Sequence, residues 1–314
     1  MIPLLAVAGP TAVGKTALAI EVALRLHGEI ISADSMQVYR HLDIGTAKPT
    51  LKEREQVPHH LVDVVEPTVD YNVSRYQKEA GEAIAEVAKK GNLPLLVGGT
   101  GLYFNAVVYN YRFSPGSKTP DIRARLAREA KEGGSGALYR KLKDLDPESA
   151  ANIHPHDLRR TIRALEVFYL TGKPIHRQVL DTKSQKPDYK SLVIGINRPR
   201  EELYSRIEER VDKMMEAGLL EETEGLLAKG YSPHLKPLQG LGYRHMLLYL
   251  QGKAGLDEAV ALLKRDTRRF AKRQLTWFKK NRGIIWFTLE NDTYEGVVKK
   301  ICQKVAGEFS PGLE

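Results

Sequence analysis

The chain has 314 residues, so it can bury a sizeable core in one large or two smaller domains. Its one cysteine, Cys302, excludes an intramolecular disulfide, and no apolar run is long enough to cross a bilayer. The formal net charge is +9 and is spread unevenly along the chain. We therefore expect a cytoplasmic protein without a membrane partner and, by default, a monomer.

The first predicted element is a short buried strand, "IPLLAVA", and a helix is predicted from Thr16 to His27, ended by Gly28 as its cap. The loop between them fits the pattern G-x-x-x-x-G-K-[ST] at every fixed position: Gly9, Pro10, Thr11, Ala12, Val13, Gly14, Lys15 and Thr16. In this context, backbone N–H groups converge on phosphate oxygens at the positive end of the helix dipole. Lys15 adds a positive charge, and the Thr16 hydroxyl can hold Mg²⁺. The loop therefore predicts a phosphate site.

The second strand, "EIISAD", ends in Asp34, and a helix from about Ser74 to Lys90 leads to the third strand, "LPLLVGG". Strands that alternate with helices predict a parallel α/β sheet. A nucleotide hydrolase would need a Mg²⁺-binding acid after an apolar strand, but the third strand ends in glycine. Asp34 has three interpretations: a metal ligand, a turn-forming residue, or a general base beside the phosphate loop.

The sequence Gly98-Gly99-Thr100-Gly101 closes the third strand and has two interpretations. The glycines could form only a tight turn. They could also let a substrate approach the backbone at the carboxyl end of a strand, where α/β folds bind ligands.

The pattern changes from about Phe113 to Tyr189, where no strand is predicted and the chain is helical and basic. Strand character returns in "SLVIGIN", and "IIWFTL" is the last predicted strand. Between them a long amphipathic helix is predicted from Arg200 to Lys229, with an apolar side made of Leu203, Ile207, Val211, Met214 and Leu219. The predicted fold is a P-loop NTPase-like α/β core, residues 1–112 and 191–314, with a parallel sheet flanked by helices. A helical insertion domain, residues 113–190, interrupts this core.

Basic side chains gather in two further places. Arg206 and Arg210 share one face of the long helix, where they either face solvent or clamp a diphosphate. From Lys264 to Arg282 the chain carries nine basic residues and one acid, Asp266. The aromatic pair Trp277 and Phe278 lies within this run. Such a run is either a solvated face or a surface for a phosphate backbone and stacked bases.

Seven motifs carry a resemblance to a known family: "GPTAVGKT", "ISADSMQVYRHLDIGTAKP", "VPHHLVD", "LLVGGTGLYF", "RRTIRALEV", "GLGYR" and "RQLTWFKK". In this order, from Leu4 to about Phe287, they resemble the bacterial tRNA dimethylallyltransferases, also called tRNA isopentenyltransferases. The resemblance implies that the loop holds dimethylallyl diphosphate with Mg²⁺. It further implies transfer of the dimethylallyl group to the exocyclic amine of adenosine at tRNA position 37, beside the anticodon. No γ-phosphate is hydrolysed in that reaction, which fits the missing acid after "LPLLV".

The resemblance also implies roles for individual residues. Asp34 is the implied base, Lys15 and Thr16 stabilise the leaving diphosphate, Thr100 helps place the adenine or the diphosphate, and Arg206, Arg210 or both complete the anion site. The segments that match tRNA-contacting segments of the family contain Asp34, Ser35, Met36, Gln37, Thr100, Arg123, Arg159, Arg160, Thr161, Ile162, Arg163, Gln239, Gly240, Leu241, Gly242, Tyr243, Arg244, Lys272, Arg273, Gln274, Leu275, Thr276, Trp277, Phe278 and Lys279.

Three alternatives remain at this point. An adenylate isopentenyltransferase, which prenylates free AMP, ADP or ATP, would share the loop and Asp34 but would not need two basic surfaces. A small-molecule kinase would bind ATP in the loop and would need the metal-binding acid that is missing. A non-catalytic RNA-binding protein would not need Lys15, Thr16 and Asp34 intact.

Overall fold

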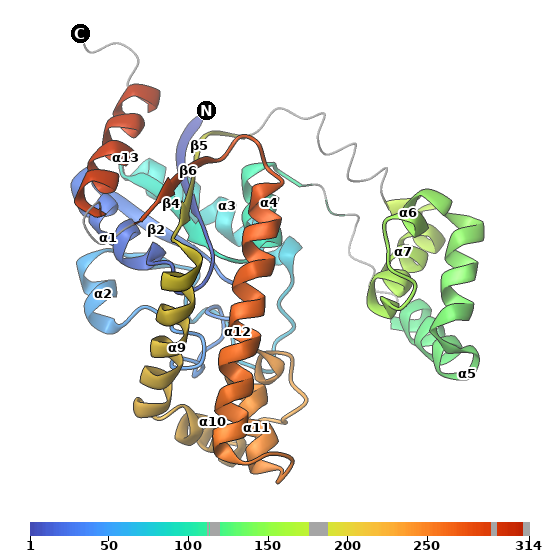
Figure 1. Ribbon diagram of the computed structural model, residues 1–314. Helices are drawn as coiled ribbons and strands as arrows, with labels where there is room; N and C mark the ends of the chain where they lie inside the picture. The colour runs from blue at the N-terminus through green and yellow to red at the C-terminus, as the bar shows by residue number, and fades with distance from the viewer. Residues whose placement is uncertain (112, 114–119, 176–187, 290–293, 310–314) are drawn as a thin grey trace. The chain divides into compact units, whose positions relative to one another are not determined.

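The computed structural model describes residues 1–111, 113, 120–175, 188–289 and 294–309 (Figure 1). The chain forms two compact units, one of Met1–Val108 with Asp188–Glu314 and one of Tyr109–Pro187, hereafter the larger unit and the helical unit. The sequence placed Tyr189 and Lys190 in the insertion, but both belong to a strand of the larger unit. This expectation was wrong because the apolar run that marks the strand begins only two residues later.

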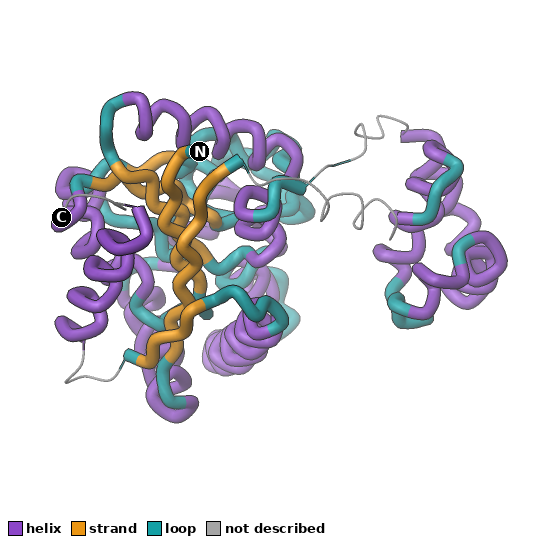
Figure 2. The backbone as a smooth tube through the Cα atoms, turned by 90° about the horizontal axis from the view of Figure 1, so that it is seen from above, coloured by secondary structure: helices purple, strands orange, loops and turns teal. Residues whose placement is uncertain are grey.

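The larger unit is built on a six-stranded sheet of order β3-β2-β4-β1-β5-β6, in which every pair of neighbours is parallel. Its strands are β1 (Ile2–Ala8), β2 (Gly28–Ala33), β3 (His59–His60), β4 (Leu93–Gly98), β5 (Tyr189–Asn197) and β6 (Ile285–Thr288). Figure 2 shows helices on both sides of the strands. The α/β fold class with a parallel sheet flanked by helices is confirmed.

The alternation of side chains along β1 explains why the sheet is covered on both faces. Leu4, Ala6 and Ala8 join one buried cluster, together with α3 (Val73–Lys89) and α4 (Gly101–Val108). Leu5 and Val7 join the other, together with α1 (Lys15–Leu26) and α13 (Tyr294–Phe309). A strand buried on both faces must be apolar at every position, which is why it reads as a continuous apolar run.

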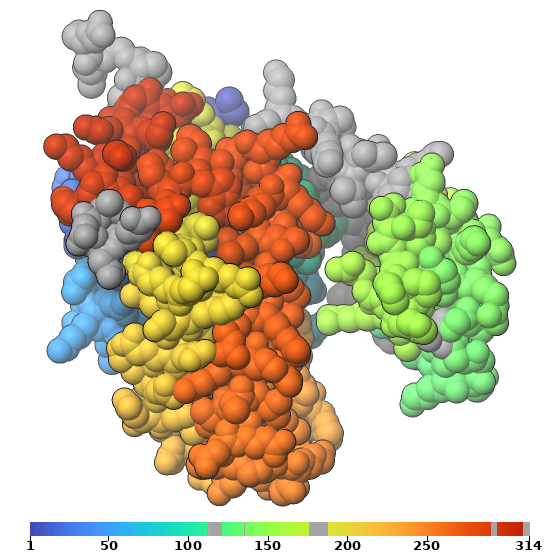
Figure 3. Space-filling view, viewed as in Figure 1, coloured from blue at the N-terminus to red at the C-terminus, as the bar shows by residue number. Residues whose placement is uncertain are grey.

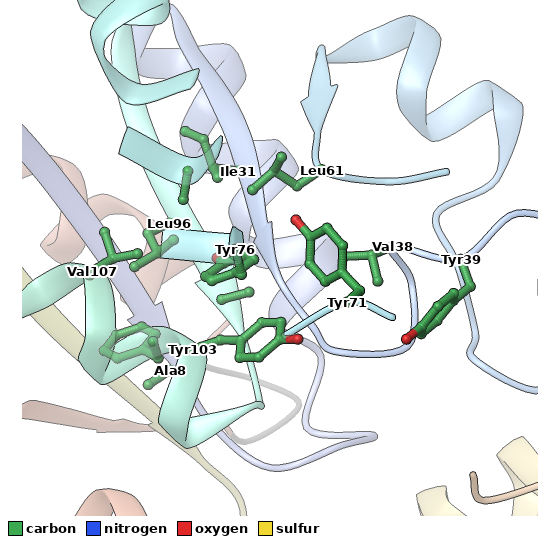
Figure 4. Close-up of a cluster of buried hydrophobic side chains, with 14 of the residues drawn as sticks. Ala8, Ile31, Val38, Tyr39, Leu61, Tyr71, Tyr76, Leu96, Tyr103 and Val107 are labelled. Atoms are coloured by element: carbon green, nitrogen blue, oxygen red, sulfur yellow. The ribbon is translucent and has the colours of Figure 1, made fainter. Parts of the chain in front are cut away.

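A group of tyrosines supports the end of β2, just before Asp34 (Figure 4). The rings of Tyr76 and Tyr103 stack with centroids 4.2 Å apart. The Tyr76 hydroxyl donates a hydrogen bond of 3.0 Å to the Ser32 carbonyl, and Tyr76 is fully buried. These contacts fix the end of β2, from which the segment that begins with Asp34 continues.

Two sequence expectations about helix ends are corrected. The predicted helix 200–229 is two helices, α9 (Arg200–Glu216) and α10 (Leu219–Ala228), because Gly218 adopts a left-handed conformation with φ 94°. Gly28 does not cap α1; His27 takes the left-handed position with φ 49°, and Gly28 begins β2. A Cβ at Gly28 would lie 2.3 Å from Leu95 Cδ1, so close strand packing explains this glycine.

Helices α9 and α12 (Leu256–Lys279) lie side by side on one face of the larger unit, as Figures 1 and 3 show. Ion pairs join them: Lys264 Nζ lies 2.6 Å from Asp212 Oδ1, and Arg268 pairs with Glu208. The unit is completed by α2 (Leu51–Gln56), a 3₁₀ turn at Pro237–Gln239 and α11 (Tyr243–Leu250).

The helical unit has a core of its own. It contains α5 (Pro120–Leu145), kinked at Gly134 with φ 76°, α6 (Pro147–Ala151) and α7 (Leu158–Thr171). Its buried cluster consists of Leu126, Ala130, Leu138, Leu142, Ala150, Ala164 and Leu165. Its described residues contain no strand, as expected from the sequence. In neither unit do the described residues include a helix that is both long and apolar enough to span a membrane.

Candidate active site

A cavity of about 370 Å³ lies at the carboxyl ends of the central strands. Its wall includes Thr11 after β1, Asp34 after β2 and Gly98 at the end of β4, and side chains of α9 and α12 close it. Strand β1 lies between β4 and β5, and the strand order reverses at this position. Parallel α/β sheets bind ligands at such a point.

The phosphate loop Gly9–Thr16 joins β1 to α1 and has an unusual backbone. Ala12 and Gly14 adopt left-handed conformations, with φ 62° and 101°. A Cβ at Gly9 would lie 2.6 Å from the carbonyl oxygen of Ile196 on β5, so only glycine fits there. Alternating right- and left-handed residues turn successive N–H groups toward one side of a loop, which suits an anion.

Cationic side chains hold three carbonyl groups of this loop. Arg198 Nε donates to the Val13 carbonyl at 2.9 Å, and Arg206 Nε donates to the Ala12 carbonyl at 3.1 Å. Lys15 Nζ donates to the Pro10 carbonyl at 2.6 Å. With their carbonyls fixed by these donors, the peptide groups keep one orientation. The loop is therefore preorganised by its own sequence and also by Arg198, which follows β5, and Arg206 on α9.

Arg206 and Arg210 both face the phosphate loop, so the solvent-facing interpretation of this pair is wrong. Arg210 Nη1 lies 3.4 Å from Thr11 Oγ1 and lines the cavity. Burial lowers the pKa of Arg210, and the nearby Asp34 carboxylate partly opposes this. Burial, together with the charge of Arg210, lowers the pKa of Lys15 to about 7. Two half-buried cations at one loop form a strong site for an anion.

Asp34 and Thr100 meet at the ends of β2 and β4. Asp34 Oδ1 accepts a hydrogen bond of 2.8 Å from Met36 N, so the turn-forming interpretation is correct. Asp34 also lines the cavity with Lys15, so a turn role and a chemical role are compatible. Thr100 Oγ1 accepts a hydrogen bond of 3.0 Å from Ser35 N and fixes this turn against β4.

Close packing explains the glycines at the end of β4, and the substrate-approach interpretation stays a prediction because Gly98 and Gly99 also line the cavity. None of Gly98, Gly99 and Gly101 is among the residues with positive φ. A Cβ would lie 2.2 Å from the Ala33 carbonyl oxygen at Gly98 and 2.3 Å from a side-chain nitrogen of α12 at Gly99. These glycines therefore allow other parts of the protein to approach closely.

Two parts of the cavity wall were not predicted from the sequence. One is the turn Gly45–Ala47, whose Thr46 and Ala47 carbonyls accept hydrogen bonds from Gln37 Nε2 at 3.4 and 3.1 Å. The other is the apolar and small side chains of α9 and α12: Val211, Met214, Leu263, Thr267 and Phe270. The spacing of 263, 267, 270 and 274 on one face of a helix was a signal that could have found the second part.

The predicted tRNA contacts of the larger unit divide into three sets. Those that line the cavity are Asp34, Ser35, Met36, Gln37, Thr100, Gln239, Gly240, Leu241, Gly242, Arg244, Arg273 and Gln274. Lys272, Thr276, Trp277 and Lys279 are exposed on α12, and Leu275 is half-buried. Tyr243 and Phe278 are buried, so neither ring can reach a base, and the expectation that Phe278 offers a stacking surface is corrected.

The two buried rings have structural partners. The Tyr243 hydroxyl donates to Glu222, and Phe278 packs edge-to-face on Phe104 with centroids 5.4 Å apart. Sequence adjacency placed Phe278 with Trp277, but consecutive residues of a helix point in different directions.

The predicted contacts of the helical unit lie in or beside α7. Arg123 and Arg163 each donate to Glu166 Oε2 at 2.8 Å, and Glu166 is buried. Arg159 and Arg160 are exposed, and Ile162 is half-buried beside the unit's core. Thr161 is buried and its hydroxyl donates to the Asp157 carbonyl, so its role as a contact is corrected to a structural one.

The family profiles and the sequence relatives that match this chain are isopentenyl or dimethylallyl transferases. The profile of the family described as IPP transferase matches residues 37–281, and the profile of isopentenyl transferase matches residues 2–64. A tRNA dimethylallyltransferase of Pelotomaculum thermopropionicum is 50% identical over 307 residues, which are 97% of each chain. The enzyme of the same name from Carboxydothermus hydrogenoformans is 50% identical over 298 residues, 95% of this chain and 96% of the relative.

The solved structures that this chain resembles are also transferases acting on tRNA. The full-length tRNA isopentenylpyrophosphate transferase of Bacillus halodurans is 41% identical, with a TM-score of 0.73 and 98% of each chain covered. A eukaryotic dimethylallyltransferase acting on tRNA is 28% identical, with a TM-score of 0.82, 98% of this chain and 79% of that chain covered.

Proposed function

This chain belongs to the IPP transferase family, and we propose from that membership that it transfers a dimethylallyl group to an adenosine of tRNA. The observation that carries the proposal is the cavity in which the Asp34 carboxylate and the half-buried Lys15 of the phosphate loop both lie. An anion site and a proton acceptor in one cavity are what a transfer from a diphosphate to an amine requires.

The diphosphate of dimethylallyl diphosphate would bind the phosphate loop, Lys15 and Arg210. As the bond between the allylic carbon and the diphosphate oxygen breaks, negative charge gathers on the leaving group, and these donors stabilise it. Only the ammonium form of Lys15 supplies this attraction, so the step depends on the protonation of Lys15.

Mg²⁺ fits this cavity through the Thr16 hydroxyl, a hard oxygen donor in the cavity wall. Among the described residues no cluster of three or more histidine, cysteine or acidic side chains could hold a metal by itself. A bound Mg²⁺ would therefore take most of its ligands from phosphate and water, and it would supply charge neutralisation to the diphosphate.

The acceptor would be the exocyclic amine of adenosine at tRNA position 37. This nitrogen is a weak nucleophile, and it loses a proton as its bond to the allylic carbon forms. We assign that proton to Asp34, whose Oδ1 is held by Met36 N while its other oxygen accepts no hydrogen bond in the part of the chain that the structure describes. The base must leave the anticodon stack to reach the cavity, which costs about a few kcal/mol.

The exposed Lys272, Thr276, Trp277 and Lys279 of α12 would contact the RNA backbone and an unstacked base. In the helical unit, Arg159 is exposed and available to phosphates, whereas the exposed Arg160 is paired with Asp157. We further propose that the protein acts in the cytoplasm as a monomer.

The test is a transfer assay with labelled dimethylallyl diphosphate and Mg²⁺, in which unmodified anticodon stem-loop RNA and free AMP are offered in parallel. Label in the RNA at position 37 is expected. Label in AMP alone would make the protein an adenylate isopentenyltransferase. Label in neither acceptor would contradict the proposal and call for an ATP-binding test of the kinase alternative.

A substitution at Asp34 separates catalysis from RNA binding. Asp34→Asn keeps the acceptor for Met36 N but removes the proton acceptor, so transfer should fall by about 10²-fold or more while RNA binding is kept. Thr46→Ser, at another position of the cavity wall, is the matched control. A fully active Asp34→Asn variant would remove Asp34 as the base.

A further inference from the structure

Gln274 lies in the run "RQLTWFKK" and faces inward, unlike the exposed residues of that run. Its exposed fraction is only 7%, and its side chain lines the cavity. Its Oε1 accepts a hydrogen bond of 2.8 Å from Thr11 N, and its Nε2 donates a bond of 2.9 Å to the Gly99 carbonyl. One amide group therefore joins α12 to the phosphate loop and to the end of β4.

We propose that Gln274 is a positioning residue of the diphosphate site and not a contact of the RNA. It fixes Thr11, and through it the first half of the phosphate loop, relative to the segment that carries Thr100. The proposal rests on the proposed function in one respect, since it takes the anion of this loop to be the diphosphate of the donor.

The amide makes both hydrogen bonds because it carries an acceptor and a donor on the same planar group. The fit is close on both sides. A Cβ at Gly99 would lie 2.3 Å from Gln274 Nε2, so the glycine makes room for the amide. On its other side Thr11 is held by Arg210, whose Nη1 lies 3.4 Å from the Thr11 hydroxyl. Thr11 is thus fixed from α9 and from α12.

The two faces of α12 separate this role from RNA binding. Leu263, Thr267, Phe270 and Gln274 all line the cavity, at helical spacing. Lys272, two residues before Gln274, is exposed. Gln274 can therefore be changed without removing a charge from the outer face, and Lys272 can be changed without touching the phosphate loop.

The experiment measures two affinities in the whole protein, that for inorganic diphosphate with Mg²⁺ by calorimetry and that for anticodon stem-loop RNA by fluorescence anisotropy. In Gln274→Met the side-chain length is kept and both hydrogen bonds are lost. We expect the diphosphate Kd and the KM for dimethylallyl diphosphate to rise about tenfold, with the RNA Kd unchanged. Lys272→Gln, the matched control, should weaken RNA binding and leave the diphosphate Kd unchanged.

A second variant, Gln274→Glu, tests the same two hydrogen bonds independently of Gln274→Met. It keeps the acceptor for Thr11 N, loses the donor to Gly99 and adds a negative charge, so it should weaken diphosphate binding more than Gln274→Met. Weaker RNA binding with unchanged diphosphate affinity, or an equal loss of both, would overturn the inference. If the wild-type protein binds diphosphate but labels no RNA, the proposed function fails while the Gln274 comparison still decides the inference.

Discussion

Replacing Glu222 with alanine should loosen the cavity wall at Gly45. The Glu222 carboxylate, on α10, accepts hydrogen bonds from three consecutive backbone N–H groups: Asp43 at 3.0 Å, Ile44 at 2.9 Å and Gly45 at 3.2 Å. It also accepts the hydroxyl of the buried Tyr243. No other residue of the described chain holds these three amides, so the turn depends on one side chain.

The magnitude follows from what the substitution leaves behind. The Ile44 and Gly45 amides are partly buried, whereas the Asp43 amide is exposed and can bind water instead. A buried polar group that loses its partner destabilises a protein by about 1–3 kcal/mol, and here two amides and the Tyr243 hydroxyl are affected. Allowing for partial hydration, we expect the free energy of unfolding to fall by about 2–4 kcal/mol.

Urea unfolding followed by tryptophan fluorescence is the suitable assay, because both tryptophans of the chain, Trp277 and Trp286, lie in the larger unit. Glu221→Ala is the matched control, since Glu221 is also an acid in the first turn of α10 but is exposed. Both substitutions lose the same interaction with the helix dipole. An equal loss of stability in the two variants would refute the reasoning.

Glu222→Ala should also affect the kinetics unequally. The wall Gly45–Ala47 lies beside Gln37, whereas the phosphate loop is held separately by Arg198 and Arg206. We therefore expect the KM for RNA to rise more than the KM for dimethylallyl diphosphate. Equal changes in both would mean that the whole cavity, and not this wall, had been disturbed.

Four further predictions concern Lys15 and the basic helix α12. Because burial lowers the pKa of Lys15 to about 7 and a bound diphosphate favours the ammonium form, binding near pH 8 should take up a proton, measurable by calorimetry in two buffers of different ionisation enthalpy. Without the anion, the unfolded state binds more protons between about pH 7 and 10.5, so stability should rise with pH over that window, and a flat response would contradict the shift. Phe278→Ala should lower the free energy of unfolding by about 3–5 kcal/mol, whereas Trp277→Ala should weaken RNA binding with little loss of stability; urea unfolding and anisotropy distinguish the two. Lys272→Gln should reduce the slope of log K against log salt for RNA by about one, while Arg268→Gln, which loses a charge already paired, should change it less.

The parts of the fold that the sequence predicted are those where a local pattern has one structural explanation. The apolar runs at Ile2–Ala8 and Leu93–Gly98 are bounded by glycine and are buried on both faces, so they became strands of the sheet. The meeting of Lys15, Asp34 and Thr100 was also predictable, because the carboxyl ends of parallel strands share one edge.

The errors have a common physical cause, which is that side-chain direction and glycine conformation depend on distant neighbours. Gly218 breaks a helix and Gly28 does not cap one, yet nothing in the local sequence distinguishes them. Gln274 and Glu222 were not recognised as supports of the cavity, because their partners lie far away in the sequence, 263 residues for Thr11 and Gln274.

Helix α12 shows why a count of charges overstates a nucleic-acid surface. The count includes Arg268 and Lys264, but both charges are already paired with acids on α9. Arg268 pairs with Glu208, and Lys264 pairs with Asp212. Such pairs hold α12 against α9 and leave less charge for phosphates. The charges that remain available are those on the outer face, such as Lys272 and Lys279, while the inner face of the same helix supports the diphosphate site. A single helix can therefore serve both substrates, because its two faces carry different chemistry.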